Sequence, residues 1–252
     1  MPELIDSADV VALPLTGTEE LIIGILLCDR PVLDTWVESL NALRSPLRRG
    51  TIAVRSAGRD KLREIQAART GITERALKVG ARWLFFLDDD VIVAPNTLEE
   101  LLAALRSNPR ARIMGGIYGS RGNLGSDPGV FKSAHEPFLD YPRGRPFTCA
   151  WMAGGCMLID LRVFASIPKP WYRYEIRGQQ LVKGEDEWLC GEVRRLGYEV
   201  MAHGGVVCPH LDARLETSDF KGRDPWTVRY FNGRYVDQAG NVLRKSQLGG
   251  SI

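Results

Sequence analysis

Three consecutive aspartates, Asp88, Asp89 and Asp90, follow the most apolar segment of the chain in the run WLFFLDDDVIV, residues 83–93. Adjacent carboxylates repel one another and raise each other's pKa unless a positive charge lies among them. Carboxylate oxygens suit Mg²⁺ or Mn²⁺, and they leave coordination positions for water and substrate phosphates. A solvated strand end or a helix-capping cluster is the alternative. Because the acids end a fully apolar strand, we favour the metal site.

A second pair of acids, Glu185 and Asp186, stands in the segment KGEDEW directly after Gly184. Acids in a first helical turn are favoured by the helix dipole whatever the function, so capping alone explains the pair equally well. The helix follows an irregular stretch that can reach the ligand edge of a sheet. A carboxylate in that place can act as a general base on an acceptor hydroxyl.

Two further residues have types that suit a phosphate site. His210, in VVCPHLD, ends a predicted strand. A lone histidine there is more often a structural hydrogen-bonding residue, but beside a carboxylate metal site it becomes the obvious remaining ligand. Arg69 stands among small residues in QAARTG, where a guanidinium can grip a diphosphate.

The elements that must position these residues alternate between strands and helices in the first half of the chain. Apolar runs predict strands, and helical spacing of apolar residues predicts helices. A break is expected in the second helix near Gly71. The expected strands are residues 20–28, 50–56, 83–88 and 112–119, and the expected helices are 34–45, 60–79 and 96–107. This alternation predicts an α/β, Rossmann-like and mostly parallel central sheet flanked by helices. Ligands bind at the carboxyl ends of such strands, where Asp88 to Asp90 stand.

The second half of the chain is less regular. Residues 119–146 are rich in Gly, Pro, Ser and Arg, which predicts a long loop. Strand-like segments resume on both sides of a break at Gly154 and Gly155, and a helix is expected from residue 184, with Trp188 among its inward residues. Asn232-Gly233 predicts a hairpin in a C-terminal extension. We expect an N-terminal extension (1–19), a single domain (20–211, with halves 20–119 and 120–211) and the C-terminal extension (212–252).

Composition excludes several other classes of protein. The chain has 252 residues, of which 44% are hydrophobic and 25% charged, as in an ordinary globular protein. Its net charge of +2 is too small to indicate nucleic acid or an anionic membrane as partner. Five cysteines without a CxxC pair argue against a disulfide framework and a structural zinc site. The acidic opening and the absence of a long apolar run predict a cytoplasmic protein with no secretory signal and no transmembrane segment.

Five segments of the chain, in the order in which they occur, resemble those of the glycosyltransferase A (GT-A) fold and its large family-2-like group. The resemblance covers about residues 20–211. It rests on five features in the family's order: LIIGILLCDRP, AARTGITERAL, GARWLFFLDDDVIV, GGCMLIDLRVF, and GEDEWLCGEVRRLGYEV with a histidine after it. The resemblance implies a transferase that uses a nucleotide-sugar donor, a UDP- or GDP-sugar, with Mn²⁺ or Mg²⁺ as cofactor.

The resemblance also implies roles for single residues. Asp186, with Glu185 beside it, is the expected catalytic base, which favours inversion. Asp90 and His210 are the expected metal ligands. The residues expected to bind the nucleotide-sugar are Asp88, Asp89, Arg69, Asp29, Arg30, Gly154 and Gly155. The acceptor stays open: a glycan, a lipid carrier, a protein or a hydroxylated nucleobase would each suit.

The chain departs from the family's pattern where the nucleotide is read. The first strand ends LLCDRP, which puts Asp29 and Arg30 in the nucleotide-facing turn, and the second strand is followed by no acid before Asp60. Two alternatives therefore stay open. One is a Mg²⁺-dependent phosphohydrolase of the haloacid dehalogenase type, with the first aspartate as nucleophile. The other is a non-catalytic, transferase-like carbohydrate-binding module.

Overall fold

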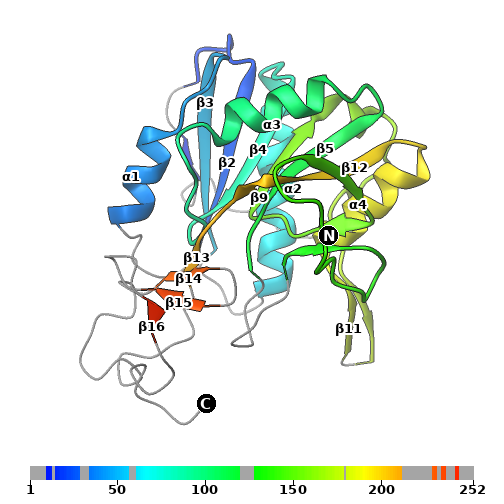
Figure 1. Ribbon diagram of the computed structural model, residues 1–252. Coiled ribbons are helices and arrows are strands. Elements are labelled where there is room, and N and C mark those ends of the chain that lie inside the picture. Colours follow the sequence, from blue (N-terminus) through cyan, green and yellow to red (C-terminus); the bar gives the residue numbers. More distant parts are fainter. Residues whose placement is uncertain are drawn as a thin grey trace.

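An eight-stranded sheet runs through the molecule in the order β1-β3-β2-β4-β9-β5-β12-β7 (Figure 1). The computed structural model describes residues 10–12, 15–28, 34–56, 61–119, 128–178, 180–211, 229–231, 234–236 and 242–243. The strands are β1 (Val10–Ala12), β2 (Leu21–Cys28), β3 (Arg49–Ser56), β4 (Trp83–Asp88), β5 (Ala111–Ile117), β7 (Pro146–Cys149), β9 (Cys156–Asp160) and β12 (Glu199–Val207).

Five of these strands, β3, β2, β4, β5 and β12, point in one direction, while β1, β9 and β7 run against them. The mostly parallel sheet predicted from the sequence is therefore present. The antiparallel strand β9 lies between β4 and β5 and pairs with both. The strand–helix alternation did not predict this insertion, because a strand's apolar pattern says nothing about its direction.

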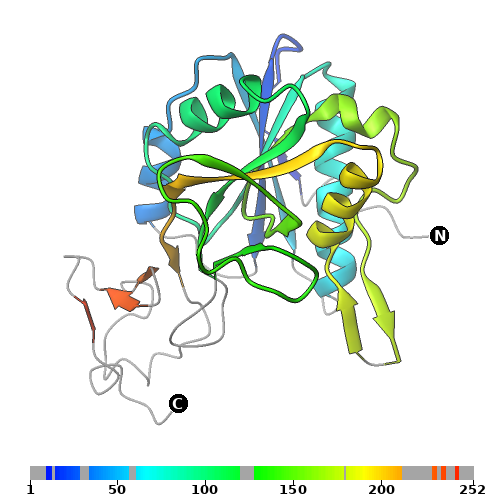
Figure 2. The same cartoon turned by 45° about the vertical axis from the view of Figure 1, so that its right-hand side comes forward.

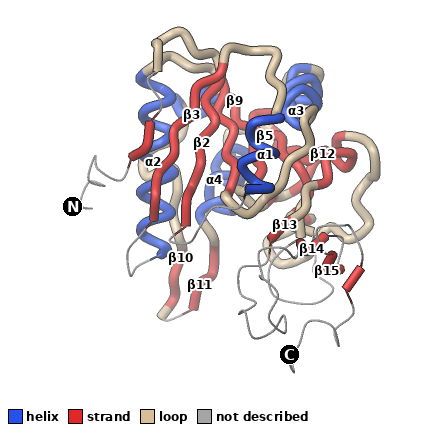
Figure 3. Tube along the Cα trace, turned by 90° about the vertical axis from the view of Figure 1, so that its left-hand side faces the viewer, coloured by secondary structure: helices blue, strands red, loops and turns tan. Residues whose placement is uncertain are grey.

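Helices cover both faces of the sheet, as Figures 2 and 3 show. The helices α2 (Lys61–Lys78) and α4 (Glu185–Arg195) pack into one core through residues such as Ile72 and Leu189. The helices α1 (Asp34–Ala42) and α3 (Thr97–Arg106) pack into the other core through residues such as Trp36 and Leu101. With both faces covered, the central strands read as continuous apolar runs.

The helix α2 is continuous through Gly71, so the break expected there is wrong. A different glycine governs its packing. A Cβ at Gly24 in β2 would lie 2.7 Å from the Ile72 side chain, which is closer than carbon atoms approach. Gly24 therefore lets α2 lie close against the strand.

The region expected to be a long loop contains some regular structure. The short strand β6 (Val130–Phe131) pairs with β8 (Trp151–Met152), and a 3-10 helix, η2 (Leu161–Ala165), follows β9. A hairpin of β10 (Glu175–Arg177) and β11 (Gln180–Lys183) projects from the body and leads into α4 (Figure 2). Trp188 of α4 is only partly buried, although its spacing predicted an inward position.

The last described strands form a separate four-stranded sheet, in the order β13-β14-β15-β16. Their bounds are β13 (His210–Leu211), β14 (Arg229–Phe231), β15 (Arg234–Val236) and β16 (Val242–Leu243). The strands β14 and β15 pair antiparallel, as the hairpin prediction requires, while Asn232 and Gly233 lie outside the described residues. The hairpin is thus part of a larger sheet that begins at His210.

Candidate active site

The three aspartates lie at the carboxyl end of β4, where backbone and indole donors fix the turn. Asp88 is the last residue of the strand, and its carbonyl accepts hydrogen bonds from the Trp36 indole (2.9 Å) and from the Val91 amide (3.1 Å). The Asp89 carboxylate is buried and accepts a 2.7 Å hydrogen bond from the Cys28 amide at the end of β2. Asp89 therefore joins the ends of two neighbouring strands, while half-buried Asp88 faces the site.

A pair of glycines at the start of β9 lies against Asp88. The Asp88 amide donates to the Gly155 carbonyl (3.0 Å), and the Gly155 amide donates to the Tyr118 hydroxyl (2.6 Å). A Cβ at Gly155 would lie 2.7 Å from both the Asp88 carboxylate and the Tyr118 hydroxyl, and a Cβ at Gly154 would lie 2.7 Å from the Arg69 guanidinium. Only glycine fits at either position without displacing a polar group of the site.

The side chain of Arg69 is buried, only 5% exposed, and it links both acidic motifs. Its Nε donates to Glu185 at 3.1 Å, while its Nη2 donates to Asp88 and its Nη1 to the Gly154 carbonyl, each at 3.4 Å. Burial alone would lower the pKa of Arg69, but the carboxylates of Asp88 and Glu185 outweigh it and raise that pKa. A buried cation with these partners holds its neighbours in place as a unit.

Asp186 lies at the start of α4 and faces the glycine turn. Its carboxylate accepts hydrogen bonds from the Glu187 amide (2.7 Å) and from the Gly154 amide (3.3 Å). Burial, and then the charge of Glu185, raises the pKa of Asp186 to about 7, while Arg69 opposes the shift. A carboxylate with a pKa near neutrality suits a general base, because it is both deprotonated and basic enough to accept a proton at pH 7.

Asp90 and His210 form the second cluster of the site. His210 lies 3.4 Å, Nε2 to Oδ1, from the buried Asp90 carboxylate, and its chain is held to the same turn by the Ile92 amide, which donates to the Pro209 carbonyl (2.9 Å). The His210 Nδ1 lies 2.6 Å from the Gly119 carbonyl, which can only accept a hydrogen bond. In neutral His210, Nδ1 is therefore the donor and the lone pair of Nε2 faces Asp90.

This pair suits a divalent cation whose other coordination positions are filled by water and substrate oxygens. Among the described residues, no group of three or more His, Cys, Asp or Glu side chains is arranged to hold a metal ion. Asp90 and His210 offer one oxygen and one nitrogen, and the Gly119 carbonyl orients the imidazole as second-shell partners of metal sites do. Mg²⁺ and Mn²⁺ commonly take one or two protein ligands and fill the other positions with water and phosphate oxygens.

The residues expected from the sequence fall into four sets. One set meets around the glycine turn: Asp88, Arg69, Gly154, Gly155, Glu185 and Asp186. Asp90 meets His210, and Asp89 instead contacts the end of β2. Asp29 and Arg30 lie outside the described residues.

Two aromatic residues of the site had not been expected. Tyr118 holds the glycine turn and packs edge-to-face on His210, with ring centroids 5.1 Å apart, and Trp36 holds the Asp88 carbonyl. Burial and the Asp88 charge raise the pKa of Tyr118, so its hydroxyl stays neutral. The available signal was the position of Tyr118 directly after the apolar strand β5, at the same sheet edge as Asp88.

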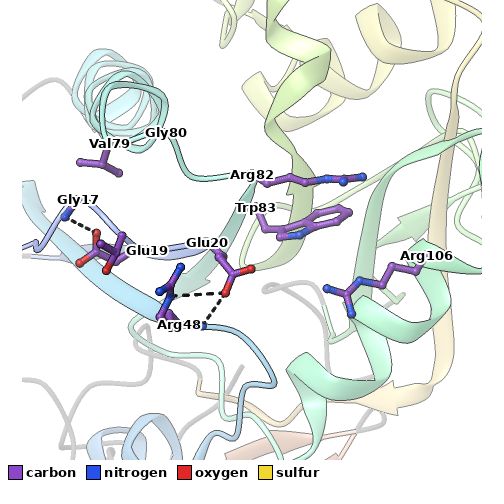
Figure 4. Close-up of a pocket in the computed structure, with 10 residues that line it drawn as sticks. Gly17, Glu19, Glu20, Arg48, Val79, Gly80, Arg82, Trp83 and Arg106 are labelled. Carbon is purple, nitrogen blue, oxygen red and sulfur yellow. Dashed lines mark hydrogen bonds and ion pairs between the residues drawn. The ribbon is translucent and has the colours of Figure 1, made fainter.

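The opposite, amino edge of the sheet carries a different polar cleft, of about 440 Å³ (Figure 4). Its lining includes Glu20, Arg48 and Arg82, with Trp83 behind them. Arg48 and Glu20 pair at 3.7 Å with their side chains 69% and 48% exposed. Arg82 lies over the Trp83 ring at 4.7 Å and pairs with Asp160. The side chains of Arg48, Glu20 and Arg82 are exposed, whereas that of Asp160 is only 3% exposed.

Comparisons with known proteins agree with this fold. Residues 59–167 match the sequence model described as glycosyl transferase family 2, a segment that contains Arg69, Asp88 and Gly154. The crystal structure of A197 from STIV is similar to this structure, with a TM-score of 0.58 and 13% sequence identity over 89% of this chain and 96% of that chain. At that identity the similarity concerns the fold alone.

A search of curated proteins found no match to the chain. In the part of the chain that the structure describes, no helix is long and apolar enough to span a membrane. The resemblance and the GT-A fold predicted from the sequence are confirmed, and the family match supports a glycosyltransferase.

Proposed function

We propose that this chain, with its match to glycosyl transferase family 2, transfers a sugar from a nucleoside-diphosphate sugar to an acceptor hydroxyl, with Mn²⁺ or Mg²⁺ and with inversion. One observation carries the proposal. Asp88, Asp186 and the Asp90–His210 pair gather at the carboxyl edge of the sheet, where Gly155 leaves room for the Asp88 carboxylate and the Gly154 amide donates to Asp186. This edge is where α/β sheets bind nucleotides.

On this proposal the donor lies along the ends of β4 and β9. Half-buried Asp88 accepts hydrogen bonds from a ribose or sugar hydroxyl, and the glycine turn allows the donor to approach the backbone. Arg69 was expected to grip the diphosphate, but its guanidinium is buried among Asp88, Glu185 and the Gly154 carbonyl. We therefore give Arg69 a positioning role, together with Glu185. Asp89 likewise positions the turn.

The metal would be held by Asp90 and His210 together with the donor's diphosphate. A bound divalent ion supplies positive charge that stabilises the diphosphate as it leaves. Asp90 contributes a buried carboxylate, and the Gly119 carbonyl keeps the His210 Nε2 lone pair directed at it.

Asp186 performs the proton transfer of the reaction. Its carboxylate takes the proton of the acceptor hydroxyl as the acceptor oxygen forms a bond to the anomeric carbon. The bond between that carbon and the diphosphate oxygen breaks, and its electron pair leaves with the nucleoside diphosphate. Attack opposite to the leaving group inverts the configuration. The amides of Gly154 and Glu187 keep the Asp186 carboxylate in one orientation.

Neither alternative explains the site as well. A phosphohydrolase of the haloacid dehalogenase type needs the first aspartate as a free nucleophile, whereas the Asp88 carboxylate pairs with Arg69 at 3.4 Å. The family match also favours a transferase. A non-catalytic sugar-binding module would not need an acid with a pKa near 7 at the site, as Asp186 has.

The proposal is tested by a thermal-shift panel of UDP, GDP, CDP, ADP and dTDP, each with and without Mn²⁺. A ligand that binds only the folded state raises the melting temperature by linkage, so the acceptor need not be known. We expect one nucleotide to stabilise the wild type only with Mn²⁺, and Asp90→Asn to lose that shift. The matched control is Glu99→Gln, which neutralises a 40% exposed carboxylate on α3. A shift that persists in Asp90→Asn, or that none of the nucleotides produces at millimolar concentration, would contradict the assignment.

A further inference from the structure

A groove of about 310 Å³ lies beside Asp186 and has no role in the donor site. The segments 132–134 and 150–151 form one wall, and residues at the end of β11 and along α4 form the other. Its lining residues include Lys132, Ser133, Trp151, Lys183, Glu187 and Arg194.

Two short chain connections place this groove next to the reacting carboxylate. Glu187 lines the groove and directly follows Asp186, to which its amide donates at 2.7 Å. On the other wall, Trp151 stands three residues before Gly154, whose amide donates to Asp186 at 3.3 Å. Three residues of extended chain span at most about 10 Å. A molecule in the groove therefore lies within one sugar ring or two of Asp186.

Trp151 gives the groove a rigid aromatic wall. Its ring stacks on Phe131 with centroids 3.7 Å apart and planes 5° from parallel. Its indole N–H donates to the Ser133 carbonyl at 3.1 Å, so the ring is held at both its face and its edge. A fixed ring with apolar surface and polar surroundings suits a ligand that has both kinds of surface, as sugars do.

The charges of the groove favour an anion. Lys132, Lys183 and Arg194 line it, and Glu187 is the one acid among the lining residues. Burial raises the pKa of Glu187, while the charges of Lys183 and His135 oppose that shift. Lys132 also pairs at 2.6 Å with Asp140, whose side chain is 75% exposed. Such an exposed pair gives up its partner to a competing anion at little cost.

We propose that this groove binds the acceptor, and that the acceptor is a sugar carrying a phosphate or a carboxylate. The acidic group contacts Lys183 and Arg194, the ring packs against Trp151, and the reacting hydroxyl points to Asp186. This inference rests on the proposed function, because the groove is an acceptor site only if Asp186 is the base.

The Trp151 indole N–H is a suitable reporter in ¹H–¹⁵N NMR spectra, once Trp151→Phe has identified its signal. The probes are methyl glucuronide, glucose 6-phosphate and neutral methyl glucoside, each added with and without saturating Mn²⁺ and the nucleotide found by the thermal-shift panel. We expect at least one acidic probe to shift the indole signal with an affinity about tenfold above that of the neutral probe, which corresponds to about 1.4 kcal/mol.

Variants distinguish a specific binding site from non-specific electrostatic attraction. Lys183→Gln combined with Arg194→Gln should abolish the preference for the acidic probe. Arg195→Gln should keep it, because Arg195 pairs with Glu192 at 2.8 Å and does not line the groove. The preferred probe separates the two sources of charge, carboxylate and phosphate. Equal binding of acidic and neutral probes, an unchanged preference in the double variant, or tighter binding of a short single-stranded oligonucleotide would each overturn the proposal.

The two proposals fail in different ways. If a nucleotide binds with Mn²⁺ but no acidic sugar perturbs Trp151, the acceptor inference is wrong and the transferase proposal stands. If an acidic sugar perturbs Trp151 but no nucleotide binds, the groove is a sugar site and the transferase proposal is wrong.

Discussion

The two edges of the sheet carry similar numbers of charged side chains in very different surroundings. At the amino edge, Arg48 and Glu20 pair in solvent, with side chains 69% and 48% exposed. At the carboxyl edge, the Arg69 side chain is only 5% exposed and contacts two carboxylates and a carbonyl. Exposed pairs contribute little to stability, whereas a buried charge depends on its partners. The edges differ in the burial of their cations, because the buried Asp160 of the amino edge pairs with an exposed Arg82, whereas Arg69 is itself buried among its partners. We take this buried cation, more than the number of charges or the size of the cleft, as the mark of the proposed site.

The largest difference between the two edges is expected when the buried cation Arg69 is replaced. Arg69→Gln would leave Asp88 and Glu185 as unpaired acids in a buried site, so we expect a loss of about 3–5 kcal/mol in the free energy of unfolding. Urea denaturation monitored by circular dichroism measures it. The double variant Arg69→Gln with Glu185→Gln should recover part of the loss, because it removes one uncompensated charge. If Arg69→Gln lost less free energy of unfolding than the amino-edge variant Arg48→Gln, the charges of the carboxyl edge would not depend on one another.

The next largest effect concerns Asp186, the proposed general base. Asp186→Asn keeps the size of the side chain and an acceptor for the amides of Gly154 and Glu187, but it cannot accept the acceptor's proton. We expect kcat to fall by about 10²–10⁴-fold with nucleotide affinity unchanged. The activity of the wild type should rise with pH through about 7, as the carboxylate loses its proton. A pH-independent rate between pH 5 and 9 would exclude Asp186 as the base.

The same residue links activity to stability with a definite sign. The folded-state pKa of Asp186 is raised from its ordinary value of 3.8 to about 7, so the folded protein binds this proton more tightly than the unfolded chain does. The ionised carboxylate therefore destabilises the fold above pH 3.8, increasingly up to about pH 7. Asp186→Asn should melt a few degrees higher than the wild type at pH 8, by roughly 2–4 °C, and the gain should shrink at pH 5. An equal or lower melting temperature at pH 8 would contradict the raised pKa.

A smaller effect is expected at the glycine turn. The Cβ of Gly155→Ala would lie 2.7 Å from the Asp88 carboxylate and from the Tyr118 hydroxyl, so one of them must move. Overpacking of this kind costs about 1–3 kcal/mol, and we expect weaker nucleotide binding as Asp88 shifts. Gly71→Ala on α2 is the matched control, because no atom lies within 4 Å of a Cβ there. Equal stability and nucleotide affinity in the two variants would contradict a close-packed turn.

The smallest loss of stability is expected at the amino edge, and it serves as the reference for the carboxyl-edge variants. Arg48→Gln removes a largely exposed partner of Glu20, and we expect a loss of less than about 1 kcal/mol with unchanged nucleotide binding. The same urea denaturation and thermal-shift measurements apply. A loss of several kcal/mol, or weaker nucleotide binding, would mean that burial does not separate the two edges.

The elements of the first half of the chain were predictable because each carries its signal locally. Apolar runs gave the strands, and three acids after the most apolar of them marked the ligand edge. The role of Arg69 was not predictable, since its partner Glu185 lies 116 residues further along the chain. The contact between Asp89 and Cys28 is likewise long-range, across 61 residues. Gly154 and Gly155 were visible as a break, but the side chains that require them come from distant parts of the chain, Arg69 on α2, Asp88 at the end of β4 and Tyr118 after β5.

The strand β9 reaches from one edge of the sheet to the other. It begins directly after Gly155, at the site, and ends at Asp160, whose carboxylate pairs with Arg82 in the amino-edge cleft. Five residues of strand cover about 17 Å. Its side chains alternate between the two cores, Met157 and Ile159 in one and Cys156 and Leu158 in the other. One added residue would reverse every side chain beyond it. The number of residues from Gly155 to Asp160 is therefore constrained at both edges of the sheet at once.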